Sequence, residues 1–252
     1  GAVYSGLKEK QEDNLDIGIL FSDKICKVAG TFTTNKVRSP SVDVTEAHIA
    51  SGEARGLVAN SGCANCCVGP QGRKDAEETV SYVAKKVGVS KEEILICSTG
   101  IIGLELPVGL MKSGIDEIEL TDDGGHDLAK AILTTDSRTK ECALSVTIDD
   151  AEVLLGGIAK GSGMIHPDMA TMLCFITTDA DVELSFLRKC IKEAVDVSFN
   201  MLSIDGDTST NDTVLLYANG ASGVPPLDPR DKGAVLFQQA LLQLCIYLAK
   251  EL

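Results

Sequence analysis

Residues 160–173 contain the residue types that a chain needs to cleave itself. A loop with glycines at 161 and 163 leads into Ala170-Thr171, and the apolar residues 172–176 follow. A threonine hydroxyl is a poor nucleophile at neutral pH, and a free α-amino group on the same residue is one base that can activate it. That amine is released only when the Ala170–Thr171 bond is broken. The pattern therefore raises the hypothesis that Thr171 cuts the chain in front of itself.

Cleavage of this kind sets demands on the segment. The Thr171 hydroxyl would attack the Ala170 carbonyl to give an ester that water opens, which requires a strained backbone and a stabilised oxyanion. Gly161 and Gly163 supply backbone freedom, and Pro167 fixes one φ angle just upstream. The same pattern is also typical of an ordinary glycine turn ahead of a strand, because Ala-Thr pairs and glycine-rich turns are common.

Apolar runs and amphipathic patterns predict the elements that position this segment. Alternating or continuous apolar residues predict strands at 17–21, 28–32, 56–59, 94–97, 143–148, 153–155, 172–177 and 214–218. Helical spacing predicts helices at 45–52, 74–87, 126–131, 183–197 and 234–248. Residues 149–150 turn a hairpin that delivers Lys160 next to the cleavage segment. The last helix is apolar on most sides, but we expect it to be too short and too interrupted for a membrane span.

The composition limits the classes of function. With 252 residues, 44% of them hydrophobic, the chain suits one large domain or two small ones. Its formal net charge of −14 argues against a nucleic-acid partner and against an anionic membrane surface. No signal peptide, transit peptide or transmembrane stretch is visible, so we expect a cytoplasmic protein.

The cysteines indicate free thiols and no metal site. There are nine, an odd number, and most lie within apolar runs, which fits buried thiols in a reducing cytoplasm better than disulfides. Cys63 and Cys66 form a C-x-x-C, but no second C-x-x-C or histidine pair stands at zinc-ligand spacing. Residues 205–216 resemble a calcium loop only superficially, because the sixth position is not glycine and the twelfth is not glutamate. We therefore expect no bound metal.

Four further motifs accompany residues 160–173. They are Asn60-Ser61-Gly62 with Ala64-Asn65, the run at 98–103, Thr134-Thr135-Asp136, and residues 198–200 followed by 205–213. In this order, and over nearly the whole chain, the five motifs resemble those of the ornithine acetyltransferases, also called glutamate N-acetyltransferases, of arginine biosynthesis. Five motifs in register make the resemblance specific. One departure is Cys63, which stands where the family usually has asparagine, so no role is carried over to this position.

The resemblance implies a fold and a division of the chain. The fold is α/β (α+β), a layered αββα sandwich like that of self-processing proteins with an N-terminal nucleophile. Residues 1–170 would correspond to the alpha chain, ending at the cleavage site, and residues 171–252 to the first part of the beta chain. Together they would form one main domain. The family's chains continue further, with additional substrate-binding residues, so we expect a truncated beta chain.

The resemblance also implies a set of site residues. Thr171 would be the nucleophile, released by cleavage between Ala170 and Thr171. Thr99 and Gly100 would stabilise the oxyanion, although Thr-Gly by itself is typical of an ordinary turn. Lys160 would pair with a substrate carboxylate. A threonine from Thr134-Thr135-Asp136 would contact substrate; the choice between Thr134 and Thr135 stays open, with Thr134 favoured.

The implied activity is acetyl transfer from N-acetylornithine to glutamate through an acetyl-threonine intermediate, by ping-pong exchange. No metal or nucleotide cofactor is implied, and whether acetyl-CoA also serves as a donor stays open. The partners would be the alpha and beta fragments of the precursor itself, two of each in a heterotetramer. Two alternatives remain: a self-processing aminopeptidase or amidase of similar fold, and an inactive truncated remnant.

Overall fold

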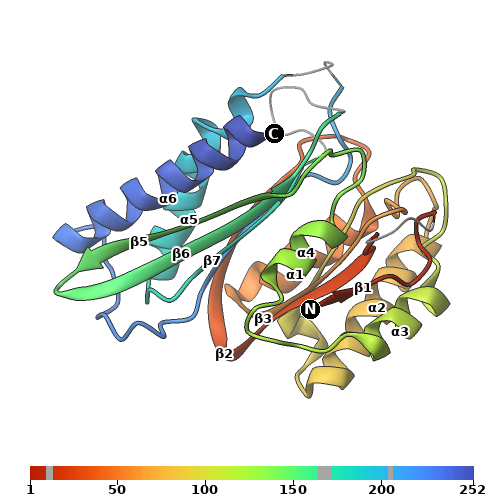
Figure 1. Cartoon of the computed structure of the whole chain (residues 1–252), viewed down its shortest axis with the longest axis horizontal. Coiled ribbons are helices and arrows are strands. Elements are labelled where there is room, and N and C mark those ends of the chain that lie inside the picture. Colours follow the sequence, from red (N-terminus) through yellow and green to blue (C-terminus); the bar gives the residue numbers. More distant parts are fainter. Residues whose placement is uncertain (10–13, 164–171, 204–206) are drawn as a thin grey trace.

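The strands form one continuous hydrogen-bonded sheet (Figure 1). A computed structural model describes residues 1–9, 14–163, 172–203 and 207–252. Within these residues the strand order is β4-β3-β2-β8-β7-β6-β5, and β1 pairs with β2. The strands are β1 Ala2–Val3, β2 Ile17–Phe32, β3 Glu53–Asn60, β4 Ile94–Ser98, β5 Lys140–Ile148, β6 Ala151–Lys160, β7 Leu173–Thr178 and β8 Thr213–Ala218.

The helices lie between and after these strands in the chain. They are α1 Pro40–His48, α2 Gln71–Val87, α3 Val108–Glu117, α4 Gly125–Ala131, α5 Leu184–Asp196 and α6 Lys232–Glu251. Three short 3₁₀ helices, Ile49–Ser51, Lys91–Glu93 and Phe199–Met201, complete the described elements.

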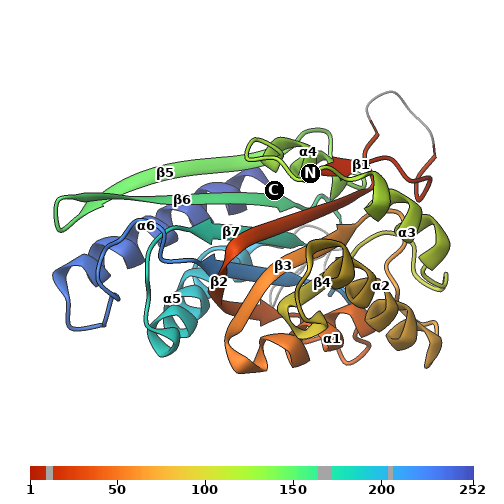
Figure 2. The same cartoon turned by 90° about the horizontal axis from the view of Figure 1, so that it is seen from below.

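Strand β2 joins the two halves of the sheet. Its residues 17–21 pair with β3, its residues 27–32 pair with β8, and the register shifts between Phe21 and Cys26. Figure 2 shows this long strand passing from one half to the other. The prediction of two separate strands, at 17–21 and 28–32, was therefore wrong. The polar residues 22–24 mark a bulge, where a strand bends without ending.

The two halves of the sheet face each other across a shared core. On β4, Leu95 and Cys97 point into the same buried cluster as Leu215 and Tyr217 of β8. The alternate residues point outward, Ile94 and Ile96 towards α2 and α3, and Val214 and Leu216 towards α5 and α6. Because strand side chains alternate between faces, this arrangement produces helix, sheet, sheet and helix layers. It confirms the expected layered α/β fold.

Helices α1 and α3 differ from the prediction. Helix α1 begins at Pro40, earlier than expected, because the Ser39 hydroxyl caps it by accepting from the Ser41 N–H at 3.2 Å and proline suits the first turn. Helix α3 was not expected, since its glycines weaken the helical pattern. Its Gly114 packs directly on the N-terminal segment, where a Cβ would lie 2.6 Å from Ser5 Cβ.

Helix α6 is longer than predicted. It has 20 residues, and of the described helices it alone is long and apolar enough to cross a membrane by length and composition. The expectation that it is too short was wrong on that count. Phe237, Leu241, Leu244 and Leu248 are nevertheless fully buried in the core cluster with β7 and α5. These contacts are those of a core helix, which has the same composition.

The β5–β6 hairpin confirms the predicted turn. Asp149 and Asp150 both have positive φ, 48° and 65°, as the favoured two-residue hairpin turns require. The hairpin register sets Lys160 at the end of β6, opposite Leu173 at the start of β7. The end of β6 thus lies beside the strand that follows the proposed cleavage segment.

Candidate active site

The loop after β4 places Thr99 and Gly100 beside the loop after β3. The Thr99 N–H donates to the Asn60 carbonyl at 3.0 Å, and the Ile101 N–H donates to the Gly62 carbonyl at 3.1 Å. Between these two bonds, the Gly100 N–H donates to no backbone carbonyl of the described residues. It is therefore a backbone donor held in place by its neighbours and available to another acceptor.

Position 100 requires glycine. Its φ is +131°, and an added Cβ would lie 2.4 Å from the Gly62 carbonyl carbon and 2.7 Å from the Cys63 nitrogen. Both neighbours are backbone atoms of the adjoining loop, which cannot move aside as the end of a side chain could. The close approach explains why Gly100 follows Thr99 here.

Lys160 contacts Thr99 inside the protein. Its Nζ donates to Thr99 Oγ1 at 3.1 Å, and the two residues are each 1% exposed. Because Oγ1 accepts from an ammonium group, the Thr99 hydroxyl hydrogen is available to donate elsewhere. Burial lowers the pKa of Lys160 to about 8, although the charges of Asp136 and Asp212 raise it. The sequence placed these residues 61 positions apart; the fold brings them together.

Asp136 organises the loop before β5. It accepts hydrogen bonds from Lys140 Nζ and, at 2.7 Å, from the Gly161 N–H. Burial favours the neutral acid, but the bonds from Lys140 and Gly161 and the charge of Lys160 outweigh it and hold the pKa of Asp136 below its ordinary value. Asp136 thereby fixes residue 161 and, through it, the end of β6.

Thr134 and Thr135 are both exposed beside this carboxylate. The Thr134 N–H lies 3.4 Å from Asp136 Oδ2, and Thr135 Oγ1 lies 2.5 Å from Ser162 Oγ. Both threonines therefore lie near the residues that follow β6, Thr134 through Asp136 and Thr135 through Ser162. Which of the two contacts substrate stays open.

Asp212 was not singled out from the sequence. It lies in the loop before β8, where its Oδ1 accepts from the Met172 N–H at 2.8 Å. Its side chain is fully buried, and within the described residues Oδ2 has no hydrogen-bond partner. Burial raises the pKa of Asp212 to about 7, while the Met172 N–H, the Ser209 hydroxyl and Lys160 lower it. The sequence indicated only a polar tight turn here, and the adjacent buried strand was the one signal for a buried carboxylate.

Thr171 and Ala170 lie outside the described residues. The next residue, Met172, is described: its N–H bonds to Asp212, and its carbonyl accepts from the Thr213 N–H at 3.0 Å. The residue that follows Thr171 is thus held by β8 on one side. Strand β7, which starts at the following residue, pairs with β6, which ends at Lys160.

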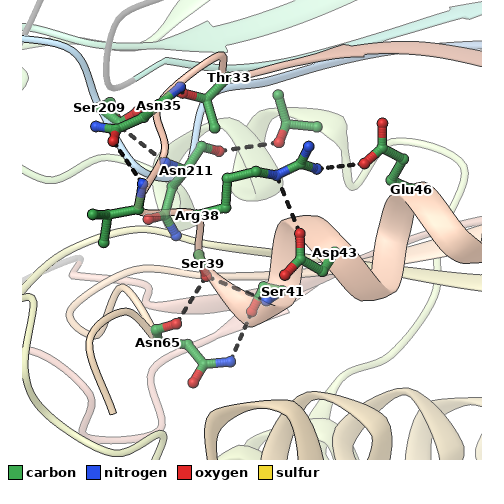
Figure 3. A network of polar contacts seen from close by, with 12 residues as sticks. Thr33, Asn35, Arg38, Ser39, Ser41, Asp43, Glu46, Asn65, Ser209 and Asn211 are labelled. Carbon is green, nitrogen blue, oxygen red and sulfur yellow. Dashed lines mark hydrogen bonds and ion pairs between the residues drawn. The ribbon is translucent and has the colours of Figure 1, made fainter. Parts of the chain in front are cut away.

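A buried polar network supports the loops around this site (Figure 3). Asn211 Nδ2 donates to the Ala64 carbonyl at 2.7 Å and to the Ser98 carbonyl at 2.8 Å. It therefore ties the loop before β8 to the loops after β3 and β4. Asn65, with φ of 50°, donates to Ser41 Oγ at 3.0 Å, and Ser41 Oγ lies 2.9 Å from Ser98 Oγ. These bonds explain the asparagines of the 60–65 and 205–213 motifs as parts of a scaffold.

The C-x-x-C cysteines do not face each other as a pair. The Cys63 thiol donates to the Leu104 carbonyl at 3.3 Å, whereas the Cys66 sulfur lies 3.7 Å from that of Cys67. Among the described residues, no three His, Cys, Asp or Glu side chains are arranged to hold a metal ion. A surface cavity of about 590 Å³ lined by Arg188 and Lys192 shares no residue with this cluster.

Comparison with known proteins places the chain in a family. The ArgJ family model matches residues 1–252. The chain belongs to the ArgJ family. The arginine biosynthesis bifunctional protein ArgJ of Dehalococcoides mccartyi is 46% identical over 252 residues. That alignment covers 100% of this chain and 62% of the relative, so the chain spans about three fifths of the relative's length.

Solved structures agree with the ArgJ fold. The ornithine acetyltransferase of Mycobacterium tuberculosis, solved with ornithine, is 32% identical, with a TM-score of 0.59 over 66% of this chain and 89% of that one. An aminopeptidase and D-Ala-esterase/amidase from Ochrobactrum anthropi, described as a variant of the Ntn hydrolase fold, is 9% identical with a TM-score of 0.51 over 98% of this chain and 81% of that one. The second likeness concerns the fold alone. It agrees with the layered fold predicted for self-processing proteins.

Proposed function

We propose that this chain forms part of a self-processing acetyltransferase that moves an acetyl group from N-acetylornithine to glutamate through Thr171. The observation that carries the proposal is the hydrogen bond from Lys160 to Thr99, the residue before Gly100, at the point where the end of β6 pairs with the start of β7. Membership of the ArgJ family and likeness to an ornithine acetyltransferase support the choice of substrates.

The first step is maturation. The Thr171 hydroxyl attacks the Ala170 carbonyl, the Ala170–Thr171 C–N bond breaks, and an ester forms that water hydrolyses. The Thr171 α-amine, now free, serves as the base for its own hydroxyl. Asp212 supports this step by holding the N–H of Met172, the peptide on the other side of Thr171.

The second step is acetyl transfer. The Thr171 oxygen attacks the acetyl carbonyl of N-acetylornithine, and the Thr99 hydroxyl and Gly100 N–H stabilise the oxyanion. The C–N bond of the amide breaks, the nitrogen takes the proton that the Thr171 amine accepted, and ornithine leaves. The amine of glutamate then attacks the acetyl ester, which regenerates Thr171. Removal of one oxyanion donor in such sites slows the reaction about 100- to 1000-fold.

Two-substrate kinetics test the proposal. Parallel lines in double-reciprocal plots against N-acetylornithine and glutamate are expected, with exchange of labelled ornithine into N-acetylornithine in the absence of glutamate. Net release of free acetate at the same rate with and without glutamate would instead identify a hydrolase. An unprocessed chain that neither exchanges nor hydrolyses would identify an inactive remnant.

The assembly and the location are part of the same proposal. Cleavage gives an alpha fragment that ends at Ala170 and a beta fragment that starts at Thr171 and includes residues 171–252; the two stay together because β6 of the first pairs with β7 of the second. We expect two of each fragment in a cytoplasmic heterotetramer, a stoichiometry that native mass spectrometry measures. The name bifunctional in the relatives supports a test of acetyl-CoA as a second acetyl donor.

A further inference from the structure

We propose that Lys8 binds the α-carboxylate common to the acetyl donor and the acetyl acceptor. The inference rests on the proposed acetyl transfer and adds a residue from the N-terminal segment to the site. It follows from the hydrogen bonds that hold the backbone of Lys8, from the contact that its ammonium group makes, and from the charged groups around it.

The backbone at Lys8 is held by a buried carboxylate. Asp16, which is 0% exposed, accepts from the N–H groups of Ser5, Gly6, Leu7 and Lys8 at 2.7, 3.1, 2.7 and 3.3 Å. Successive backbone N–H groups that converge on one carboxylate fix the loop. The backbone from which the Lys8 side chain extends is therefore fixed.

The Lys8 side chain reaches the substrate-contact motif. Its Nζ donates to the Leu133 carbonyl at 2.9 Å, directly before Thr134. It is partly buried, and within the described part of the chain it forms no ion pair with any carboxylate. Burial lowers the pKa of Lys8 to about 8, against the charges of Asp16 and Asp136. An ammonium group in such surroundings gains from an anionic partner.

The charges around Thr134 leave room for an anion. Lys8, Lys140 and Lys160 interact electrostatically in this region, and Asp136 is already hydrogen-bonded to Lys140 and to the Gly161 N–H. The remaining carboxylates are Asp16, which accepts from the N–H groups of residues 5–8, and Asp212, which holds Met172. Each of these carboxylates is engaged by other donors, and within the described residues none forms an ion pair with Lys8. An anionic ligand would supply that partner.

The chemistry of the two substrates selects the α-carboxylate. Both have a carboxylate one carbon away from the nitrogen that releases or accepts the acetyl group, whereas their side chains have opposite charges. In a ping-pong reaction both substrates occupy the same place in turn, so a contact with the shared group serves both. Lys160 is 1% exposed and donates to Thr99, while Lys8 lies beside the exposed Thr134. Lys8 is thus the lysine better placed for a group that enters from solvent.

The test compares Lys8→Met with Lys8→Arg and with the remote exposed control Lys24→Met, in the processed protein. Loss of a charge-assisted hydrogen bond is expected to lower kcat/KM about 10- to 100-fold. The decrease should be similar for N-acetylornithine and glutamate and should arise mainly from KM. Lys8→Arg should keep most of the activity, and Lys24→Met should behave as wild type. With the carboxamide of N-acetylornithine as donor, Lys8→Met should cause no further loss.

Each outcome has a separate meaning. Wild-type protein that transfers no acetyl group would overturn the proposed function and this inference with it. An active wild type with unchanged kinetics in Lys8→Met would overturn the role of Lys8 alone. A fall in kcat that Lys8→Arg does not rescue, or an equal loss with the carboxamide donor, would show that Lys8 only supports the Leu133 backbone and would also overturn the inference.

Discussion

The ammonium group of Lys160 donates a hydrogen bond of 3.1 Å to the hydroxyl oxygen of Thr99, and both residues are buried. This contact decides which way the hydroxyl hydrogen of Thr99 can point. Since the oxygen accepts from Lys160, the hydrogen is directed to another acceptor. We expect that acceptor to be the oxyanion formed during acetyl transfer.

Replacing Thr99 should therefore affect the chemical step. Thr99→Val keeps the shape of the side chain but removes the hydroxyl, so kcat for acetyl transfer should fall about 100- to 1000-fold. Thr99→Ser keeps the hydroxyl and should stay within about tenfold of wild type. Steady-state kinetics measure both. An equal decrease in kcat in Thr99→Val and Thr99→Ser would indicate an effect on packing and would contradict a role for the hydroxyl.

A side chain at position 100 should disrupt the loop. Gly100→Ala places a Cβ 2.4 Å from the Gly62 carbonyl carbon at a φ of +131°. A backbone conformation of this kind costs about 1 to 3 kcal/mol for a non-glycine residue, and the clash adds to it. Urea unfolding should show this loss together with loss of acetyl transfer.

Gly103→Ala is the matched control for Gly100→Ala. Its φ is also positive, +86°, but an added Cβ meets no atom within 4 Å among the described residues. The free energy of unfolding should fall by the conformational cost alone, about 1 kcal/mol. Equal stability and activity of the two variants would show that the close approach of the two loops is not the reason why position 100 needs glycine.

Asp212 should make stability depend on pH. Its pKa in the folded protein is about 7, above the value of 3.8 of a free side chain, so the folded state holds a proton that the unfolded state has released between these values. The free energy of unfolding therefore falls as pH rises from about 4 to about 7, by up to about 4 kcal/mol from this group. Asp212→Asn removes this contribution while its amide oxygen can still accept from Met172.

Urea unfolding of the wild type and of Asp212→Asn at several pH values measures this pH dependence. Relative to the wild type, the free energy of unfolding of Asp212→Asn should increase between pH 4 and 7 and then stay constant. A difference that is independent of pH would show that Asp212 is ionised throughout the range.

The side-chain amide of Asn211 should contribute more to the free energy of unfolding than the amide of an asparagine outside this network. Asn211→Ala leaves the Ala64 and Ser98 carbonyls without this donor inside the protein. An unsatisfied buried group costs about 1 to 3 kcal/mol, so we expect a loss of about 2 to 5 kcal/mol. Asn14→Ala, at a half-buried position where Nδ2 donates only to the Glu9 carbonyl at 2.9 Å, should cost only about 1 kcal/mol. Denaturant unfolding compares the two, and similar values would contradict a supporting role for the network.

The sequence predicted the parts of the fold that depend on local patterns. The alternation of apolar residues gave the β5–β6 hairpin, and the resemblance directed attention to Thr99, Gly100 and Lys160, which the fold does bring together. Strand β2 was divided in the prediction because residues 22–24 are polar. A bulged strand exposes such residues where it bends between two half-sheets, and only the pairing of the whole sheet reveals this.

The contributions of Asp212 and Lys8 could not be predicted for a different reason. Both are polar residues in polar stretches, and their importance comes from burial and from neighbours distant in sequence. Asp212 matters because Met172 lies against it, 40 residues away, and Lys8 because Leu133 lies 125 residues away. Local patterns contain no information about such pairs.

The most direct test of the account is intact mass spectrometry of the purified protein before and after incubation with N-acetylornithine. The account predicts two fragments that separate between Ala170 and Thr171, with one acetyl group gained by the fragment that begins at Thr171 and lost again when glutamate is added. A single uncut chain, or a cut chain that never gains an acetyl group on that fragment, would contradict it.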